Sequence, residues 1–578
     1  MDGPEPHSRE ERSGSRTSDR LDSWKEIAAY FKRDQRTVRR WEESEGLPVH
    51  RHQHKSRAAI FAYKSELDAW WDNGRQRLEG DAQTTAARGT RRLIWPAAAA
   101  GILLVVGGMF ARHWLRDRSI RAHVQSIAVL PLANLSQDPG QDYLADGLTE
   151  ALTTNLGKLS ALRVISRTST AQYKGTKKSI PEIARELHVD ALVEGAVMRS
   201  GDRVRITAQL IEAPADRHVW AETYDRDVRD VLALQADVAR AIAVQIRGKF
   251  SSAPPHGASP LNPEAYELYL KGRYSRDEGT EDGLKLAFEY FLQAIEKDPQ
   301  YAPAYAGLAD SYALLPFYSE TRPGEAFPKA KAAAMKALQL DATLAEAHAS
   351  MAYVKTYYDW DWEGAEQEFK RTLDLNPNHA DAHHAYSRFL ASLGRLTEAR
   401  AELKRAQELD PLSLLVQANA GVISYFARRY DEAIQELQKI SELDSHFFVP
   451  HWGMGLCYEQ EGKYEDAIAQ FQKTIELSGR GANTIASLGH VFGLAGRPSE
   501  AQKILLELKA RSKKRYVSSY QVALVELGLG YKDQAIRDLE AAFEERSTLL
   551  TYLKMDPRFD PLRSDSRFQD LLRRVGLP

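Results

Sequence analysis

The most regular feature of the chain is a pattern of apolar positions with helical spacing that repeats every 34 residues. Each repeat contains a small alanine, and a large apolar residue follows it four positions later. Because residues four apart lie on one face of a helix, each such pair predicts a buried helical stripe. The alanines are Ala365, Ala399, Ala433, Ala467, Ala501 and Ala535, and the large residues are Phe369, Leu403, Leu437, Phe471, Leu505 and Leu539.

A period of this length predicts a stack of two-helix units, because a single unit cannot bury its apolar face alone. Similar positions around Ala287 and Ala330 extend the pattern toward the N-terminus. We therefore expect about eight units over residues 261–546, forming an α-solenoid whose concave surface binds a protein or peptide. Residues 547–578 predict a final amphipathic helix that caps the stack.

Between residues 124 and 250 the pattern changes to alternating strands and helices. Strand-like segments are 126–134, 162–170, 218–227 and a hairpin over 191–213 that turns at residues 200–202; helical segments are 143–159, 179–189 and 231–246. This order predicts an α/β domain. The Pro-rich residues 251–260 predict a linker to the solenoid.

Two short helices are predicted near the N-terminus, after a tail over residues 1–20 that has the composition of a disordered segment. Ser23 followed by Glu26 is a capping-box pattern that starts a helix over residues 24–31. Asp34 caps a second helix over residues 35–45, which Gly46 ends. Two helices joined by so short a turn predict a helix-turn-helix.

Basic residues gather on this second helix and on the hairpin that follows it. Residues 32–57 contain eight Lys or Arg and four acidic residues. Side chains on the first turns of such a helix can reach base edges in a major groove, and flanking cations neutralise phosphates. We therefore expect double-stranded DNA to be bound by Gln35, Arg36, Thr37, Arg39, Arg40, Arg51, Lys55 and Arg57. A solvated charged face is the alternative.

Nineteen consecutive residues without a charge, 93–111, follow a linker over residues 79–92. At about 1.5 Å per residue a helix of this length spans roughly 28 Å, close to the hydrocarbon thickness of a bilayer. The segment predicts one transmembrane helix; a buried core helix is the alternative. The flanking charges favour a cytoplasmic N-terminus only slightly, but a DNA-binding module must face the cytoplasm.

Composition limits the remaining chemistry. The net charge of −2 excludes no class of partner, whereas a single cysteine, Cys457, excludes an intramolecular disulfide and a cysteine-rich zinc site. Asp142, Asp146 and Glu150 share a helix face, which is more typical of a solvated surface than of an ion site. No nucleophile and base can be paired from any motif, so we expect no enzymatic activity, no cofactor and no metal.

The N-terminal module resembles the MerR/excisionase type of winged helix-turn-helix over about 55 residues. The resemblance rests on the segments Glu26-Ile27-Ala28, Thr37-Val38-Arg39-Arg40-Trp41-Glu42, Gly46-Leu47-Pro48 and Glu66-Leu67-Asp68-Ala69-Trp70. It implies a DNA-binding domain over residues 21–78, in which the helix with Arg36, Arg39 and Arg40 contacts DNA and a wing over residues 51–57 touches the backbone.

The other two regions also resemble known families. The middle domain resembles the FlgO-like or TolB amino-terminal-like domains of CadC-like membrane regulators, on Ile127-Ala128-Val129-Leu130-Pro131, Leu144-Ala145-Asp146-Gly147-Leu148, Ala191-Leu192-Val193-Glu194-Gly195 and Trp220-Ala221-Glu222. The 34-residue units resemble tetratricopeptide repeats over roughly 285 residues. These resemblances imply a non-catalytic middle domain and a partner-binding solenoid.

Together these patterns predict a multidomain, mainly α protein with a winged helix-turn-helix, one transmembrane helix, an α/β domain and a solenoid. We expect a membrane-integrated one-component transcriptional regulator of the bacterial inner membrane, with a cytoplasmic N-terminus and periplasmic C-terminal domains. Small residues four apart in the span, such as Ala97 and Gly101, are compatible with a homodimer. The alternative is an envelope scaffold whose N-terminal module is not a transcription factor.

Overall fold

The computed structural model describes residues 19–52, 59–72, 124–136, 138–247 and 262–577. The chain divides into two compact units, Met1–Arg112 and His113–Pro578. Three predicted segments lie outside the described residues: the linker 79–92, the membrane span 93–111 and the second linker 251–260. Within that described part, no helix combines the length and the apolar character needed to cross a membrane.

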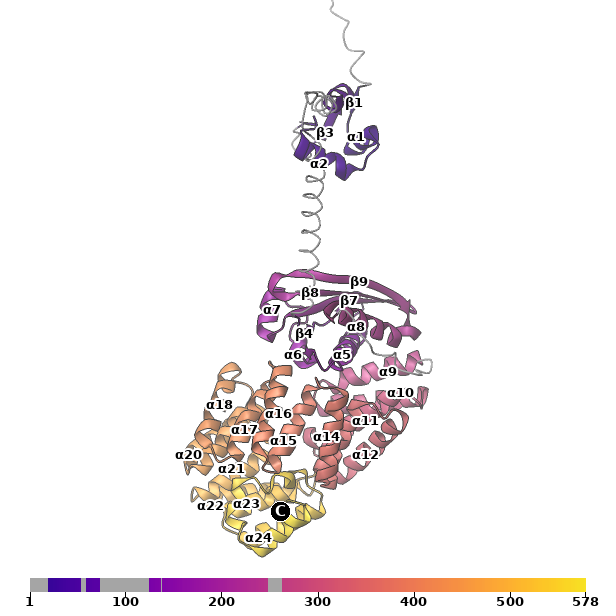
Figure 1. Cartoon of the computed structure of the whole chain (residues 1–578). Helices are drawn as coiled ribbons and strands as arrows, with labels where there is room; N and C mark the ends of the chain where they lie inside the picture. Colours follow the sequence, from indigo (N-terminus) through magenta and orange to yellow (C-terminus); the bar gives the residue numbers. More distant parts are fainter. Residues whose placement is uncertain (1–18, 53–58, 73–123, 137, 248–261, 578) are drawn as a thin grey trace, which may run out of the picture. The chain divides into compact units, whose positions relative to one another are not determined.

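The described part of the N-terminal unit contains helices and a small sheet (Figure 1). Its helices are α1 (Trp24–Phe31) and α2 (Gln35–Glu45), and residues 64–72 are also helical. Strand β3 (Ala59–Tyr63) pairs antiparallel with both β1 (Arg20–Leu21) and β2 (His50–His52). Arg20, which the sequence placed in a disordered tail, therefore belongs to the sheet.

A compact apolar core holds this unit together. Its buried members are Ile27, Ala28, Val38, Leu47, Ala62 and Leu67. The predicted cap at Ser23 forms, since the Ser23 hydroxyl accepts from the Glu26 N–H at 3.2 Å. The Glu26 carboxylate accepts from the N–H of Asp22 at 2.8 Å, one residue earlier than a regular capping box would have it.

The second unit begins with a mixed sheet of the order β6-β4-β7-β8-β9, in which β5 also pairs with β7. Strands β4, β5, β6 and β7 are parallel where they pair, and β7, β8 and β9 form an antiparallel meander. The strands are β4 (Ser126–Val129), β5 (Ala133–Asn134), β6 (Arg163–Val164), β7 (Ala191–Ser200), β8 (Arg203–Glu212) and β9 (Arg217–Asp227). The predicted hairpin forms, and Gly201 takes the positive φ of 59° in its turn.

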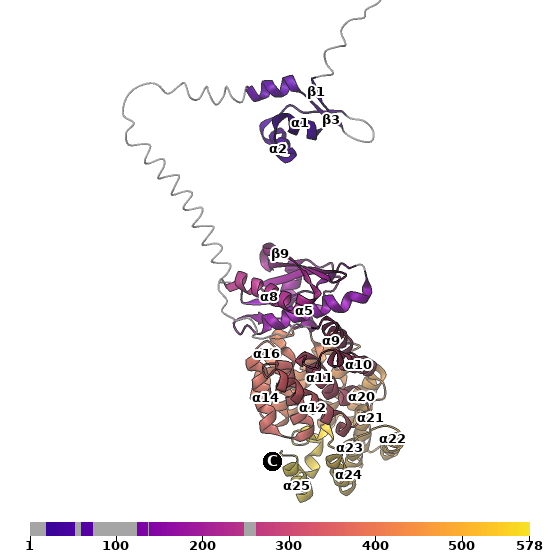
Figure 2. The same ribbon diagram turned by 90° about the vertical axis from the view of Figure 1, so that its right-hand side faces the viewer.

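Helices pack on both faces of this sheet at β4. Alternate residues of β4 divide between them, because successive side chains of a strand point to opposite faces. Ile127 and Val129 join a core with α5 (Asp142–Gly157) and α8 (Val231–Arg247), while Ala128 packs against α7 (Ile180–Leu187). The sheet and its helices appear in a second orientation in Figure 2.

Two strand predictions were wrong in part. Residues 162–170 form only the short β6, after which Ser166 caps the helix α6 (Arg167–Ala171) by accepting from the Ser169 N–H. A serine that caps a helix takes the backbone out of the strand ladder. Residues 126–134 break at Pro131, which has no N–H to donate, and resume as β5.

The solenoid consists of eight consecutive helix pairs within residues 262–577 (Figures 1 and 2). The pairs are α9 (Pro263–Arg276) with α10 (Glu281–Lys297), α11 (Ala302–Tyr318) with α12 (Pro323–Leu340), α13 (Ala345–Val354) with α14 (Trp362–Leu375), α15 (Ala380–Ser392) with α16 (Leu396–Leu409), α17 (Leu414–Phe426) with α18 (Tyr430–Leu443), α19 (Phe448–Gln460) with α20 (Tyr464–Ser478), α21 (Ala482–Leu494) with α22 (Pro498–Arg511), and α23 (Ser519–Gly528) with α24 (Lys532–Glu544).

The periodic alanines lie in the core between packed helices. All six, from Ala365 to Ala535, are fully buried, and the large residues that follow them are at most 4% exposed. Leu437 illustrates the packing: a β-carbon on Gly421 or Gly453 would lie 2.5 or 2.7 Å from its side chain. Large residues of the second helices therefore fill grooves that small residues leave in the first helices.

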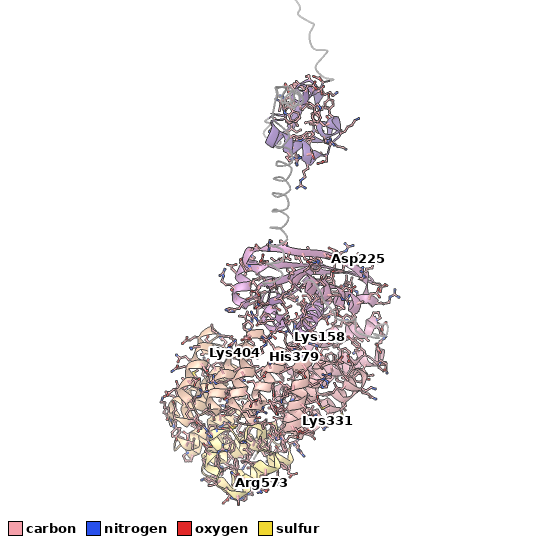
Figure 3. The ribbon with its side chains drawn as sticks, viewed as in Figure 1. Lys158, Asp225, Lys331, His379, Lys404 and Arg573 are labelled. Atoms are coloured by element: carbon pink, nitrogen blue, oxygen red, sulfur yellow. The ribbon has the colours of Figure 1, made fainter. Side chains whose placement is uncertain are left out.

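The α/β domain packs against two separate parts of the solenoid. Tyr266 and Leu270 of α9 belong to the apolar core of the domain. Farther along, the Asn378 amide donates to the carbonyl oxygens of Gly157 and Leu162, both at 2.8 Å. Lys158 and His379, which flank this second contact in the sequence, are labelled in Figure 3.

The C-terminal segment does more than cap the last repeat. It contains the short 3₁₀ helices η5 (Thr548–Tyr552) and η6 (Pro557–Leu562) and one helix, α25 (Ser566–Arg574). Trp362 of α14 donates from Nε1 to the carbonyl of Val575 at 2.8 Å. Tyr552 stacks on Phe426 of α17 with ring centroids 5.8 Å apart. The C-terminal segment thus returns to the middle of the solenoid.

Candidate nucleic-acid interface and solenoid cavity

The start of α2 is fixed by a pair of side chains. The Asp34 carboxylate accepts from the Thr37 N–H at 2.9 Å and from the Thr37 hydroxyl at 2.7 Å. These bonds, the hydroxyl first, lower the pKa of Asp34, because they stabilise its charged form. Thr37, predicted to contact DNA, therefore has its hydroxyl engaged in the helix cap.

The remaining predicted residues of α2 share its outer face. Val38 is fully buried against the core of the unit, whereas Gln35, Arg36, Arg39 and Arg40 are exposed. Three guanidinium groups within the first two turns of one helix create a concentrated positive surface. The four side chains are therefore accessible, and their contact with DNA stays a prediction.

Two arginines also contact neighbouring elements of the same unit. The Arg39 guanidinium lies over the ring of Trp24, 5.3 Å from its centroid, and so connects α2 to α1. Arg51 of β2 forms an ion pair with Glu42 of α2 at 2.6 Å. Arg51 is therefore held against the helix, while Lys55 and Arg57, predicted for the wing, lie outside the described residues.

The acidic ladder of the α/β domain is engaged by basic side chains. Lys174 lies 3.2 Å from Asp142 and 3.1 Å from Asp146. Glu150, the third member, forms an ion pair with Arg273 of the solenoid helix α9. Lys174 and Arg273 thus offset two of the three negative charges, and only the Glu150–Arg273 pair joins the domain to the solenoid.

A cavity of about 350 Å³ lies on the inner side of the solenoid. Its walls come from α15, α17, α19, α21 and α23, with Phe317 of α11 and the C-terminal segment completing the lining. Several aromatic rings line the walls, among them Phe426, Trp452 and Tyr552. The volume falls in the range typical of small-molecule sites.

One ionised pair in the cavity wall is fully satisfied. Asp556 and Arg558 of the C-terminal segment are buried and lie 2.6 Å apart. Tyr425 and Tyr520 each donate to the Asp556 carboxylate at 3.1 Å. Burial alone would raise the pKa of Asp556, but the Arg558 guanidinium outweighs burial and lowers it. This pair anchors the C-terminal segment inside the solenoid.

Other polar groups in the wall were missed by the sequence analysis. His384 and Arg388 lie one turn apart on α15, and Asn419 lies on α17. Burial and the nearby charge of Arg388 lower the pKa of His384 to about 3, so this imidazole is neutral. In the sequence, the only sign of these residues is a polar side chain on the inner face of a repeat helix. Such side chains recur at no fixed spacing, so they do not mark a site.

Comparison with known proteins identifies the parts of the second unit. Residues 123–241 match the family described as "HilA/YgeH-like transcriptional regulator, second domain". The α/β domain is HilA/YgeH-like. Residues 361–418 and 451–480 match tetratricopeptide repeats. The chain thus combines a HilA/YgeH-like second domain with a tetratricopeptide-repeat solenoid, where the sequence resemblance had named FlgO and TolB for the α/β part.

Two kinds of curated protein are similar over part of their length. "Putative adenylate cyclase 3" of Rhizobium meliloti is 39% identical over 187 residues, which are 32% of each chain. "Transcriptional regulator HilA" of Salmonella typhimurium is 27% identical over 163 residues, 28% of this chain and 29% of that protein. The chain therefore spans about a third of the length of the curated relatives it matches.

Parts of the chain are also similar to solved structures. One is PilF of Pseudomonas aeruginosa, with 22% identity over 37% of this chain and 92% of that chain and a TM-score of 0.29. Another is a tetratricopeptide-repeat protein of Parabacteroides merdae, with 19% identity over 46% of this chain and 100% of that chain and a TM-score of 0.36.

Proposed function

We propose that this protein is a membrane-integrated one-component transcriptional regulator. In this proposal the N-terminal unit is a MerR/excisionase-type winged helix-turn-helix that binds double-stranded DNA in the cytoplasm. Residues 93–111 form one membrane span, and the HilA/YgeH-like domain and the solenoid bind a protein partner on the periplasmic side of the bacterial inner membrane.

The observation that carries the proposal is the outer face of α2. Arg36, Arg39 and Arg40 are exposed on a short helix whose N-terminal end is rigidly capped, and the opposite face is buried. Such a helix can enter a major groove with its side chains toward base edges. The HilA-like match of residues 123–241 supports a regulator independently, because that family is described as one of transcriptional regulators.

Pairing of two chains would strengthen DNA binding. A single small module supplies modest affinity, whereas two modules held together raise the effective concentration of the second. A dimer would also match a two-fold operator. Small residues in the predicted span support close approach of two helices.

The decisive experiment compares DNA binding of the full chain with that of the triple variant Arg36→Ala, Arg39→Ala, Arg40→Ala. We expect the triple variant to lose site-specific binding. The slope of the logarithm of its DNA association constant against the logarithm of the salt concentration should become shallower by about one unit for each lost phosphate contact. The matched control, Lys503→Ala, Lys513→Ala, Lys514→Ala, removes the same charge from exposed positions of the solenoid and keeps binding. Equal binding by both variants contradicts the proposal.

Membrane topology is tested separately with reporter fusions. A periplasmic reporter placed after residue 120 should be active, and one placed before residue 90 should be inactive. The opposite result for the first fusion would mean that the second unit faces the cytoplasm, as expected if residues 93–111 lie along the membrane surface.

The alternative function is an envelope scaffold, in which the repeats assemble proteins and the N-terminal unit contacts a protein. The solenoid is compatible with this role, because repeat arrays present large partner-binding surfaces. The triple arginine variant separates the two functions, since a scaffold would retain its assembly phenotype. No enzymatic step is part of either proposal.

A further inference from the structure

The inner side of the solenoid is enclosed by the chain itself. Tyr552 of η5 contacts both sides of the curved stack: its hydroxyl lies 3.2 Å from that of Tyr357, and its ring stacks on Phe426. The buried Asp556–Arg558 pair holds the same segment against α21, because Arg558 donates to the Ser487 hydroxyl at 3.1 Å. What remains between these walls is the cavity of about 350 Å³.

One charge in the cavity has no counterion. Among the residues that the structure describes, no carboxylate lies within ion-pair distance of Arg388, and the guanidinium donates from Nη2 to the Tyr552 hydroxyl at 2.7 Å. The other cation in the wall, Arg558, is neutralised by Asp556. Arg388 is half-buried, and because a charge withdrawn from water without a counterion is costly, it favours an anion in the cavity.

A second group in the wall points to the same conclusion. Asn419 is 6% exposed, yet its amide Nδ2 has no hydrogen-bond acceptor within the described ranges. Amide N–H groups of this kind are usually paired when buried. Asn419 and Arg388 therefore both offer donors to the cavity, and neutral His384 adds no positive charge of its own.

We propose that this cavity binds a small apolar carboxylic acid, with its carboxylate on Arg388 and Asn419 and its hydrocarbon body against Phe426, Trp452 and Leu456. The size and the aromatic walls suit a compact apolar body. The guanidinium suits a carboxylate, which it can bind with two parallel hydrogen bonds.

A free small molecule fits this site better than an extended peptide. A peptide lying along the inner helices would have to displace η5 and η6, which are held by the Asp556–Arg558 pair and by Tyr425 and Tyr520. This ligand is additional to the protein partner of the proposed function, and its binding does not depend on DNA.

Calorimetric titration of the detergent-purified full chain tests the proposal with three probes of equal chain length: octanoate, 1-octanol and octylamine. We expect saturable binding of octanoate at least about tenfold tighter than that of 1-octanol, and the weakest binding for octylamine, because only the acid pairs with the arginine.

Arg388→Met should reduce the affinity for octanoate to that for 1-octanol, while Arg388→Lys should retain a preference for the acid. Asn419→Leu should weaken octanoate more than 1-octanol.

Arg429→Met, at an outward position before α18, serves as the matched control and should leave all three affinities unchanged. Equal binding of acid and alcohol, or an acid preference that survives in Arg388→Met, would overturn the assignment. Hydrogen exchange gives a second readout that needs no variant: octanoate should slow exchange in residues 548–562. Faster exchange there would mean that the ligand displaces the C-terminal segment, which the proposal excludes.

Discussion

The hydroxyl of Ser166 donates a 2.6 Å hydrogen bond to Oδ1 of Asp410, 244 residues farther along the chain. Ser169 donates to the same oxygen at 2.5 Å and accepts from the N–H of Leu412 at 3.0 Å. Ser166 and Ser169 belong to the HilA/YgeH-like domain, whereas Asp410 and Leu412 follow α16 of the solenoid. A buried carboxylate therefore joins the two domains.

Replacement of Asp410 should separate the role of its oxygen from that of its charge. Asp410→Ala leaves two buried hydroxyls without their acceptor and should lower the free energy of unfolding by about 1–3 kcal/mol. Asp410→Asn retains an acceptor oxygen and removes the carboxylate charge, which burial disfavours, as the raised pKa of Asp410 indicates. Asp410→Asn should therefore lower the free energy of unfolding less than Asp410→Ala does. Chemical denaturation of the three proteins measures both differences, and an equal loss in the two variants would contradict this account.

Gly493 should not tolerate a side chain. A β-carbon at this position of α21 would lie 2.3 Å from the carbonyl carbon of Gly528 in α23, and backbone atoms cannot move away easily. Gly493→Ala should therefore destabilise the solenoid by about 1–3 kcal/mol, as overpacking does elsewhere. The control is Gly324→Ala in α12, where nothing lies within 4 Å of the added carbon. The control should be neutral or slightly stabilising in thermal denaturation, since alanine favours helix.

Closure of the solenoid depends on the indole of Trp362. Trp362→Phe keeps an aromatic ring near Phe389 but loses the hydrogen bond to the Val575 carbonyl, so we expect a loss of about 1 kcal/mol. Hydrogen exchange should become faster in residues 566–577 and stay unchanged in α9. Trp71→Phe, at a half-exposed position of the N-terminal unit, provides the control. Unchanged exchange in the C-terminal residues would show that other contacts suffice for closure.

The last repeat should make stability depend on pH. Burial and a hydrogen bond with Glu526 raise the pKa of Asp538 to about 7. A carboxyl group whose pKa is higher in the folded than in the unfolded state stabilises the fold fully below its unfolded pKa, and this contribution is lost as pH rises through the folded pKa. Stability should thus fall between about pH 4 and about pH 7. Asp538→Asn should flatten this dependence in denaturation series, and Asp466→Asn, at an exposed position, should not.

The amino-acid sequence by itself determined the local and periodic parts of the architecture. The 34-residue spacing from Ala365 to Ala535 predicted the helix pairs, because each pair packs mainly on its sequence neighbours. Asp34 and Gly46 predicted both ends of α2, since capping depends on residues within one turn. The exposed cluster of Arg36, Arg39 and Arg40 followed from the same helix.

Only the tertiary structure decided how distant segments meet. No sequence pattern predicted that Trp362 contacts Val575 or that Ser166 contacts Asp410, because such contacts join residues more than 200 positions apart and do not repeat along the chain. The C-terminal segment was predicted as an end cap, yet the curvature of the stacked helices brings it back inside the solenoid. Arg388 became a candidate ligand-binding residue for the same reason. The cavity wall around it is built by helices of several repeats and by the C-terminal segment, and only their assembly leaves Arg388 without a counterion.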